Sequence, residues 1–140
     1  MSDTAAYVSD VILYKRPVRQ WVLTLPTWLR RAVAHSQMLA SRILAIHIKE
    51  IESYFRSRFH RRGQIGAVTV IQRFGGALNL NPHFHTLVPD GLFLKTAAGT
   101  AQFRPVSPPT TFDINRILHR IMQGIRRFLE NHGFAMSRKL

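Results

Sequence analysis

The longest periodic segment of the chain, residues 37–62, restricts the folds that are open to it. Apolar residues recur along it at spacings of three and four, namely Ala40, Leu44, Ile48, Ile51, Phe55 and Phe59. This spacing lines one face of an α-helix, and Gly63 is a suitable residue for ending it. A helix with a single apolar stripe must bury that stripe against another element. We therefore expect a long helix that packs against a sheet.

Strand signals occur before this helix and in a run after it. The segments with β-branched or aromatic character are residues 19–25, 66–73, 83–88, 92–94 and 102–106. Because Pro89-Asp90-Gly91 is a turn signal, we expect residues 92–94 to form a hairpin with residues 83–88. The glycine- and asparagine-rich stretch 75–82 is predicted to be a loop.

Two further helices complete the predicted elements. Residues 27–34 fit a short helix, and a closing helix can be capped by Thr111 or Asp113. The apolar stripe of the closing helix is Ile114, Ile117, Ile121, Ile125 and Phe128. The order strand, helix, several strands, helix predicts an α+β fold with an antiparallel sheet flanked by helices. We expect one domain at residues 17–131, with a lead-in at 1–16 and a tail at 132–140.

The charge of the chain indicates a polyanionic partner. It has 20 Lys and Arg against 7 Asp and Glu, a formal net charge of +13. Such an excess favours nucleic acid, with an anionic membrane surface as the rival. No apolar run approaches the roughly 20 residues that span a bilayer, and the first residues lack the pattern of a signal peptide. The absence of cysteine favours a cytoplasmic protein, and ribosomal or chromatin proteins would share these properties.

Clusters of arginine are the candidates for contact with DNA phosphates. They are Arg56, Arg58, Arg61 and Arg62 at the end of the long helix, Arg73 in the second strand, and Arg116, Arg120 and Arg127 in the closing helix. A solvated helix face is the simpler interpretation of each cluster. Among aromatic residues, Phe74 is the candidate exposed ring for base stacking, whereas Trp21 and Trp28 are expected to pack in the interior.

The triplet His83-Phe84-His85 is the candidate metal site. Side chains alternate along a strand, so both imidazoles project from the same face and Phe84 points the other way. Such a pair can bind one divalent cation if a third donor approaches from a neighbouring strand. Surface histidines without a metal are the alternative. The residues that follow do not suit a cupin or a metallo-β-lactamase, and the few later acids do not suit a two-metal nuclease.

Three blocks of the sequence resemble a known family. The blocks are residues 19–26 (RQWVLTLP), residues 66–85 (GAVTVIQRFGGALNLNPHFH) and the pair Asp90-Gly91. They resemble the rolling-circle insertion-sequence transposases of the "IS ninety-one" type, which are HUH (His-hydrophobic-His) endonucleases active in DNA transposition and recombination. The resemblance covers roughly residues 15–130, and it implies an HUH-like sheet in which residues 83–85 form part of a strand.

The resemblance implies a mechanism. In the family, a His pair and a third polar ligand bind Mg²⁺ or Mn²⁺ beneath a phosphate of single-stranded DNA, such as a transposon end, and a tyrosine attacks that phosphate. His83 and His85 match the ligand pair, and Gln72 is the candidate third ligand. Asn79 and Asn81 come next, and a later residue or one beyond this chain is also open.

The sequence departs from the family in two ways. It has no cysteine-rich zinc module, and its tyrosines, Tyr7, Tyr14 and Tyr54, all precede His83 instead of following it. We therefore expect a fragment that lacks the nucleophile and cannot cleave DNA by the family route. A further hypothesis is that it associates with an intact transposase or occupies that enzyme's DNA ends. The alternative function is a non-catalytic, basic nucleic-acid-binding α+β module whose His pair is incidental.

Overall fold

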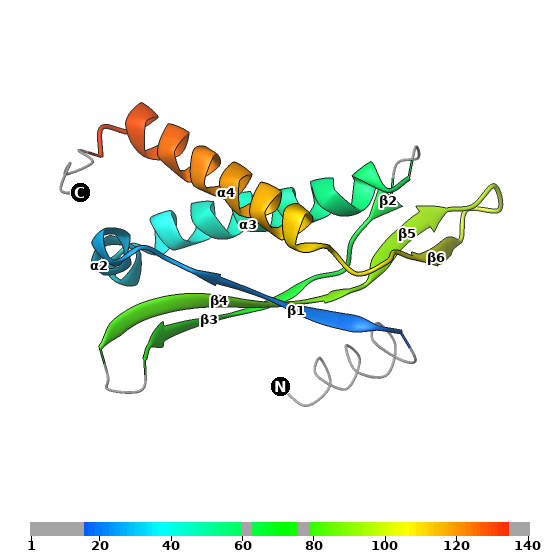
Figure 1. The fold of residues 1–140 in the computed structure, drawn as a ribbon, viewed down its shortest axis with the longest axis horizontal. Coiled ribbons are helices and arrows are strands. Elements are labelled where there is room, and N and C mark those ends of the chain that lie inside the picture. Colours follow the sequence, from blue (N-terminus) through cyan, green and yellow to red (C-terminus); the bar gives the residue numbers. More distant parts are fainter. Residues whose placement is uncertain (1–15, 60–62, 76–78, 135–140) are drawn as a thin grey trace.

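The computed structural model describes residues 16–59, 63–75 and 79–134, with helices packed on one side of a twisted sheet (Figure 1). The elements in chain order are β1 (Val18–Thr24), α2 (Thr27–His35), α3 (Gln37–Ser57), β2 (Gly63–Gln64), β3 (Val68–Phe74), β4 (Leu80–Pro89), β5 (Gly91–Lys95), β6 (Ala101–Pro105) and α4 (Thr111–Asn131). The predicted α+β class is confirmed. The predicted lead-in lies outside the described residues except for Arg16, and so does most of the predicted tail.

The strands form two antiparallel sheets instead of the single sheet that was predicted. Their orders are β1-β4-β3 and β2-β5-β6. The predicted hairpin between residues 83–88 and 92–94 is wrong, because the chain passes from β4 into β5 and β5 pairs with β2 and β6. The predicted loop at 75–82 is also too long, since Asn81 and Pro82 belong to β4.

Asp90 explains why the chain does not turn back at this point. Its N–H donates to the carbonyl of Pro17 at 2.7 Å, and its own carbonyl accepts from the N–H of Val106 at 2.8 Å. Its carboxylate accepts two hydrogen bonds from the Arg19 guanidinium, at 3.0 and 3.1 Å. The next residue, Gly91, lies so close to the Arg104 carbonyl that a Cβ there would collide with it. These contacts fix residue 90 as the junction between the two sheets.

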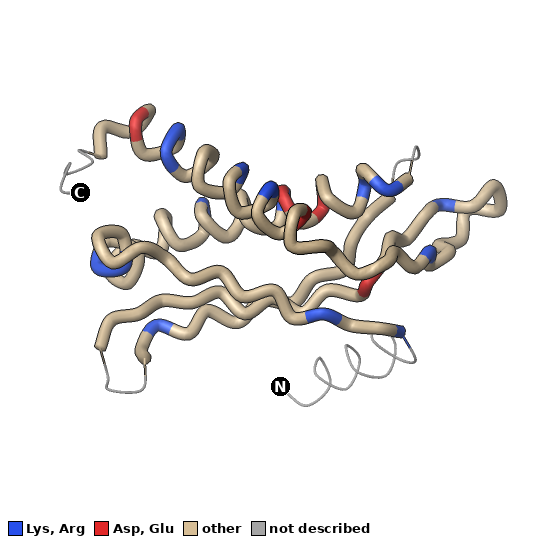
Figure 2. The backbone as a smooth tube through the Cα atoms, viewed as in Figure 1, with Lys and Arg blue, Asp and Glu red and all other residues tan. Residues whose placement is uncertain are grey.

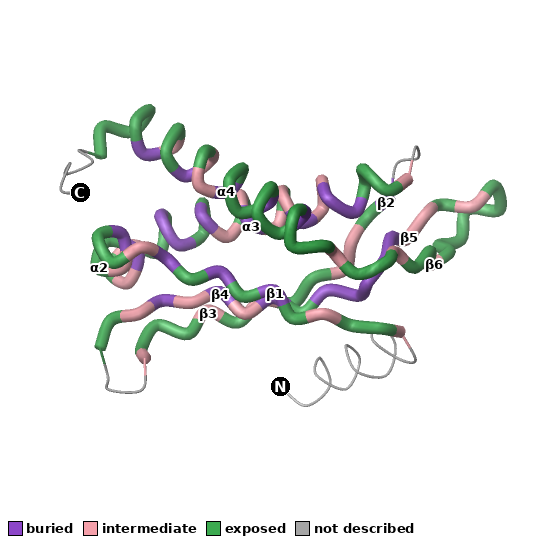
Figure 3. The backbone as a smooth tube through the Cα atoms, in the orientation of Figure 1, coloured by how far each residue is buried: buried purple, intermediate pink, exposed green. Residues whose placement is uncertain are grey.

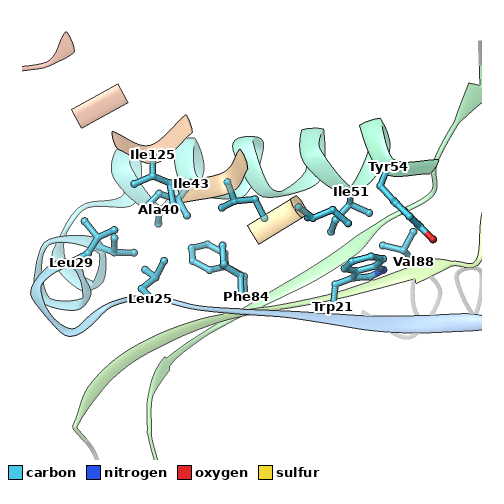
Figure 4. Packing of buried hydrophobic residues seen from close by; sticks show 14 of the residues in the cluster. Trp21, Leu25, Leu29, Ala40, Ile43, Ile51, Tyr54, Phe84, Val88 and Ile125 are labelled. Carbon is cyan, nitrogen blue, oxygen red and sulfur yellow. The ribbon is translucent and has the colours of Figure 1, made fainter. Parts of the chain in front are cut away.

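Helix α3 supplies most of the core, with a stripe displaced from the predicted one. Its buried residues are Leu39, Ala40, Ile43, His47, Ile51, Tyr54 and Phe55. The predicted Leu44 and Ile48 are only half-buried, and the helix ends at Ser57 instead of reaching residue 62. Gly63 does not end α3 but begins β2. Figure 4 shows Phe84 of β4 pointing into the cluster beneath α3, beside Leu25 and Ile43.

The described helices cover one face of the sheet β1-β4-β3 and leave its other face uncovered (Figure 1). Alternate residues of its central strand, Phe84, Thr86 and Val88, are buried under the helices. The opposite side, which we call the outer face, carries His83 and His85, and its flanking valines Val22 and Val70 are 51% and 64% exposed. Figure 3 shows this division, with buried backbone segments where the strands meet the helices. Within the described ranges, no helix is long and apolar enough to cross a membrane.

Helix α4 packs on α3 and begins with a capping box. The N-cap is Thr110, not the predicted Thr111 or Asp113: the Thr110 hydroxyl accepts from the Asp113 N–H, and the Asp113 carboxylate accepts from the Thr110 N–H. The latter bond holds the pKa of Asp113 below its ordinary value, with Arg58 adding to the effect. The buried residues of α4 are Asp113, Ile117, Ile121, Ile125 and Leu129, so the predicted Ile114 and Phe128 lie at the margins of the stripe.

We expect Thr110→Ala to lower the free energy of unfolding by about 1 kcal/mol, since it leaves an orphan N–H at the start of α4. Urea denaturation monitored by circular dichroism measures the change. Thr111→Ala is the matched control, because Thr111 is an exposed residue in the first turn of the same helix. Equal losses from the two substitutions would contradict the assignment of the cap.

Candidate metal and nucleic-acid site

His83 and His85 lie on β4, the central strand, and project from the outer face. Phe84 between them is fully buried on the other side, as the alternation predicts. The centroids of the two imidazole rings are 6.1 Å apart and their planes are inclined by 30°. Metal–nitrogen bonds of about 2.1 Å place the centroids of two imidazoles on one cation within about 6.5 Å of each other. The spacing of the rings is therefore compatible with one shared cation.

The pairing register places a defined set of neighbours around the two histidines. His83 lies opposite Thr24 of β1 and Gln72 of β3. His85 lies opposite Val22 and Val70. Residues directly opposite each other in an antiparallel pair share a face, so polar groups surround His83 and apolar groups surround His85.

Gln20 of β1 contacts His85, which the sequence reasoning missed. Its side-chain amide lies 2.8 Å from Nδ1 of His85. The atom in contact is Nε2 of Gln20, whose N–H donates to Nδ1 of His85 as the amide is placed. With the amide rotated by 180°, its oxygen would instead accept from Nδ1–H, and Nε2 of the ring would keep a free lone pair for a cation. The signal in the sequence is weak, because Gln20 reaches His85 only through the β1–β4 register, which no local pattern specifies.

The residues around His83 offer further donors to a cation. Gln72 donates from Nε2 to the Phe74 carbonyl at 3.0 Å, so its amide oxygen can serve as a ligand. Nδ1 of His83 and Oδ1 of Asn81 are buried and have no hydrogen-bond partner in the described part of the chain. Within residues 16–59, 63–75 and 79–134, no three His, Cys, Asp or Glu residues form a group able to hold a metal ion. A third protein ligand from this part of the chain would therefore be an amide or a hydroxyl.

Tyr54 lies on the wrong side of the sheet to act with the His pair. It is buried against Trp21 and Phe55, and its hydroxyl donates to the Ser107 carbonyl at 3.3 Å. Burial raises the pKa of Tyr54, which disfavours the phenolate. Figure 4 shows Tyr54 on the helix side of the strands. Tyr7 and Tyr14 lie outside the described residues.

Three of the arginines selected from the sequence have carboxylate partners: Arg120 pairs with Glu50 on α3, and Arg56 and Arg58 pair at the end of α3. Arg56 donates to the Gly63 carbonyl and pairs with Glu52 at 2.9 Å. Arg58 binds Asp113 at 2.7 Å and lies over the Tyr54 ring. These contacts join α3 to β2 and to the start of α4. Contact of Arg56 and Arg58 with DNA stays a prediction from the sequence.

The other candidate arginines divide into two groups. Arg73, Arg116 and Arg127 are exposed, as is Arg120. Arg61 and Arg62 lie outside the described residues. Figure 2 shows basic residues recurring along α3 and α4, on the helix side of the molecule, and fewer along the sheet β1-β4-β3.

The aromatic residues agree with two of the three expectations. Trp21 is buried in the core, and Phe74, at the end of β3 opposite Leu80, is 49% exposed. Trp28, expected to be interior, is 52% exposed and lines a small pocket with His119 and Arg126. Its place on the exposed side of the short helix α2 explains the difference, because Leu29 and Val33 are the residues that α2 buries.

Comparison with known proteins connects the His strand to a family. Residues 66–139, more than half of the 140-residue chain, match the family described as "Putative transposase". The match includes β3, β4 and α4, and therefore the His pair and Gln72. No curated protein and no solved structure matches the chain.

Proposed function

The chain belongs to this family of transposases, and from that premise we propose that its outer face binds a divalent cation and a single strand of DNA. His83 and His85 are the proposed ligands, with Gln72 as the third, and the site is proposed to be of the HUH class. The observation that carries the proposal is the projection of both imidazoles onto a face of the central strand that none of the described helices covers. The amide oxygen of Gln72, which lies opposite His83, would complete a set of three donors.

The donor set favours Mn²⁺ as the cation, with Mg²⁺ as the alternative. Two imidazole nitrogens and one amide oxygen are softer than the all-oxygen sets typical of Mg²⁺. A bound cation would polarise a DNA phosphate and offset the charge that develops when the phosphate is attacked. Gln20 would hold the His85 ring in the orientation needed for binding.

In this proposal the described part of the chain would supply the ligands of the cation but no tyrosine placed to attack the phosphate. Tyr54, the tyrosine in that part, is buried between the sheet and the helices, on the side away from His83 and His85 (Figure 4). In this proposal a hydroxyl from outside the described residues, or from an associated intact transposase, would attack the phosphate. The exposed apolar side chains Val22 and Val70, which lie opposite His85, would give the bases of a single strand a surface to lie on.

The test is the effect of Mn²⁺ on binding of a fluorescent 20-nucleotide single strand, measured by anisotropy. We expect Mn²⁺ to strengthen binding by the parent chain about tenfold, or about 1.4 kcal/mol. His83→Ala/His85→Ala should lose this increment and keep the parent's affinity in EDTA. His35→Ala/His119→Ala, which alters two exposed helical histidines, is the matched control and should keep the increment.

Two results would overturn the proposal. One is a parent chain whose binding ignores Mn²⁺, and the other is an increment that survives loss of both His83 and His85. Either would favour the second reading of the chain, a basic nucleic-acid-binding module in which the His pair has no ligand. The formal net charge of +13 supports that alternative.

A further inference from the structure

Helices α3 and α4 form a groove of about 550 Å³ that the proposed metal site does not use. We call it the α3–α4 groove. It is lined by four cationic side chains, Arg42 and Lys49 from α3 and Arg120 and Arg127 from α4. All four are exposed. On α3 the residues that face the sheet are Ile43, His47 and Ile51, so the groove opens on the side away from the sheet.

The four cations stand in two pairs at the two ends of the groove. At one end, Arg42 lies over the ring of Phe128 and is therefore next to Arg127. At the other end, Glu50 approaches Arg120 at 3.9 Å, and Lys49 precedes Glu50 in the chain. The helices are thus antiparallel. Each wall has its cations seven residues apart, which is two helical turns or about 10.5 Å.

The floor of the groove is uncharged and the helices meet closely there. A Cβ on Gly124 would press into the side chain of Ile46, so glycine allows the approach of α4 to α3. Ala45 and Gln123 complete the floor between the cations. The result is a shallow channel with positive charge along both rims.

The charge of the groove is not balanced from within. Glu50 is its acidic residue, and it pairs with Arg120. Arg42, Lys49 and Arg127 therefore remain as an excess of positive charge on two neighbouring helices. Like charges held together in this way lower stability unless a polyanion binds them. Their spacing of about 10.5 Å matches a rise of about three nucleotides at 3.4 Å each.

We propose that the α3–α4 groove is a second nucleic-acid site, which binds the phosphodiester backbone of duplex DNA on the side of the sheet opposite the His pair. Duplex DNA is the assigned ligand because its phosphate charge is twice as dense along the axis as that of one strand. Contacts of this kind position DNA without reading its sequence. The inference takes from the proposed function only that the ligand is DNA, and it does not depend on the metal.

The test compares two triple variants with the same change in charge. Arg42→Gln/Lys49→Gln/Arg127→Gln alters the groove and leaves the Arg120–Glu50 pair intact. Arg31→Gln/Lys95→Gln/Arg104→Gln removes the same residue types from exposed sites on α2, β5 and β6. Binding of a 20-base-pair duplex, and of one of its strands alone, is measured by anisotropy in EDTA over a range of salt concentrations, and circular dichroism checks the fold of each variant.

We expect the groove variant to bind the duplex at least tenfold more weakly at low salt and to reduce the slope of log K against log salt by about 2 to 3. The control variant should change both quantities far less, and His83→Ala/His85→Ala should leave both unchanged. Equal losses in the two triple variants would overturn the proposal, and so would a loss confined to a single-stranded oligonucleotide. Because the assay contains EDTA, its outcome is separate from that of the Mn²⁺ experiment.

Discussion

The free energy of unfolding should fall by about 3 kcal/mol as the pH is lowered from 6.5 to 4, because of His47. This residue is 3% exposed, and neither ring nitrogen has a hydrogen-bond partner among the described residues. Burial lowers its pKa from 6.5 to about 4. Between pH 6.5 and 4 the unfolded chain binds a proton at His47 that the folded chain does not bind. The free energy of unfolding therefore decreases as the pH falls through this range. Above pH 6.5 the contribution of His47 is fully present.

His47→Leu isolates this effect, because it fills the site with an apolar side chain and removes the titrating ring. Urea denaturation at pH 4 to 8 should show a shallower pH dependence for this variant, with unchanged or higher stability at pH 8. Carboxylates also titrate in this range, but their contribution cancels in the difference from the parent chain. His119→Gln, which removes an exposed imidazole, should follow the parent curve. A parent and a His47→Leu variant with the same pH dependence would refute the prediction.

Local patterns in the sequence predict the elements and the face of the His pair. Strand alternation places His83 and His85 together and buries Phe84, and this holds because the period of a strand is a property of the backbone alone. The bounds of β1, α2 and β3 follow from composition and from the proline after β1 in the same way. The resemblance of these strands to a transposase family agrees with the match of residues 66–139 to the family described as "Putative transposase".

The rest depends on contacts between distant residues, which no local pattern encodes. Pro89-Asp90-Gly91 has the composition of a turn. However, hydrogen bonds from Arg19 and Val106 to Asp90 keep the chain extended from β4 into β5. The second sheet follows from that junction. The apolar pattern of α3 is broad enough to admit two stripes, and packing against Phe84 selects the one that contains His47. A polar residue in the buried stripe could not be expected from the apolar spacing.

The site shows the same division between local and distant information. Gln72 could be proposed from the sequence because it precedes the His strand, and the register does place it opposite His83. Gln20 could not be proposed, since it is 65 residues from His85 and reaches it only through the pairing of β1 with β4. Lys49 and Arg42 were not selected for DNA contact either, because they become part of a basic groove only when α4 lies beside α3.

Mn²⁺ binding should be lost when either proposed His ligand is removed. We expect calorimetry to give saturable binding near one ion per parent chain, and His83→Ala or His85→Ala to weaken it at least about 100-fold, or about 2.7 kcal/mol. The physical reason is the rarity of donors on this face: each imidazole is one of only a few groups around the cation. Gln72→Ala should weaken binding about tenfold, since water can replace one amide oxygen.

Gln20→Ala separates an orienting role from a ligand role. It should weaken Mn²⁺ binding about 10- to 100-fold by releasing the His85 ring, and Gln20→Glu, whose carboxylate can accept from Nδ1–H, should restore it. His35→Ala/His119→Ala should bind Mn²⁺ as the parent does, because both residues are exposed on helices away from the outer face. Circular dichroism must show each variant folded. Mn²⁺ binding that persists in folded His83→Ala and His85→Ala chains would place the cation at another site. Any binding of DNA by the outer face would then not involve a metal ion.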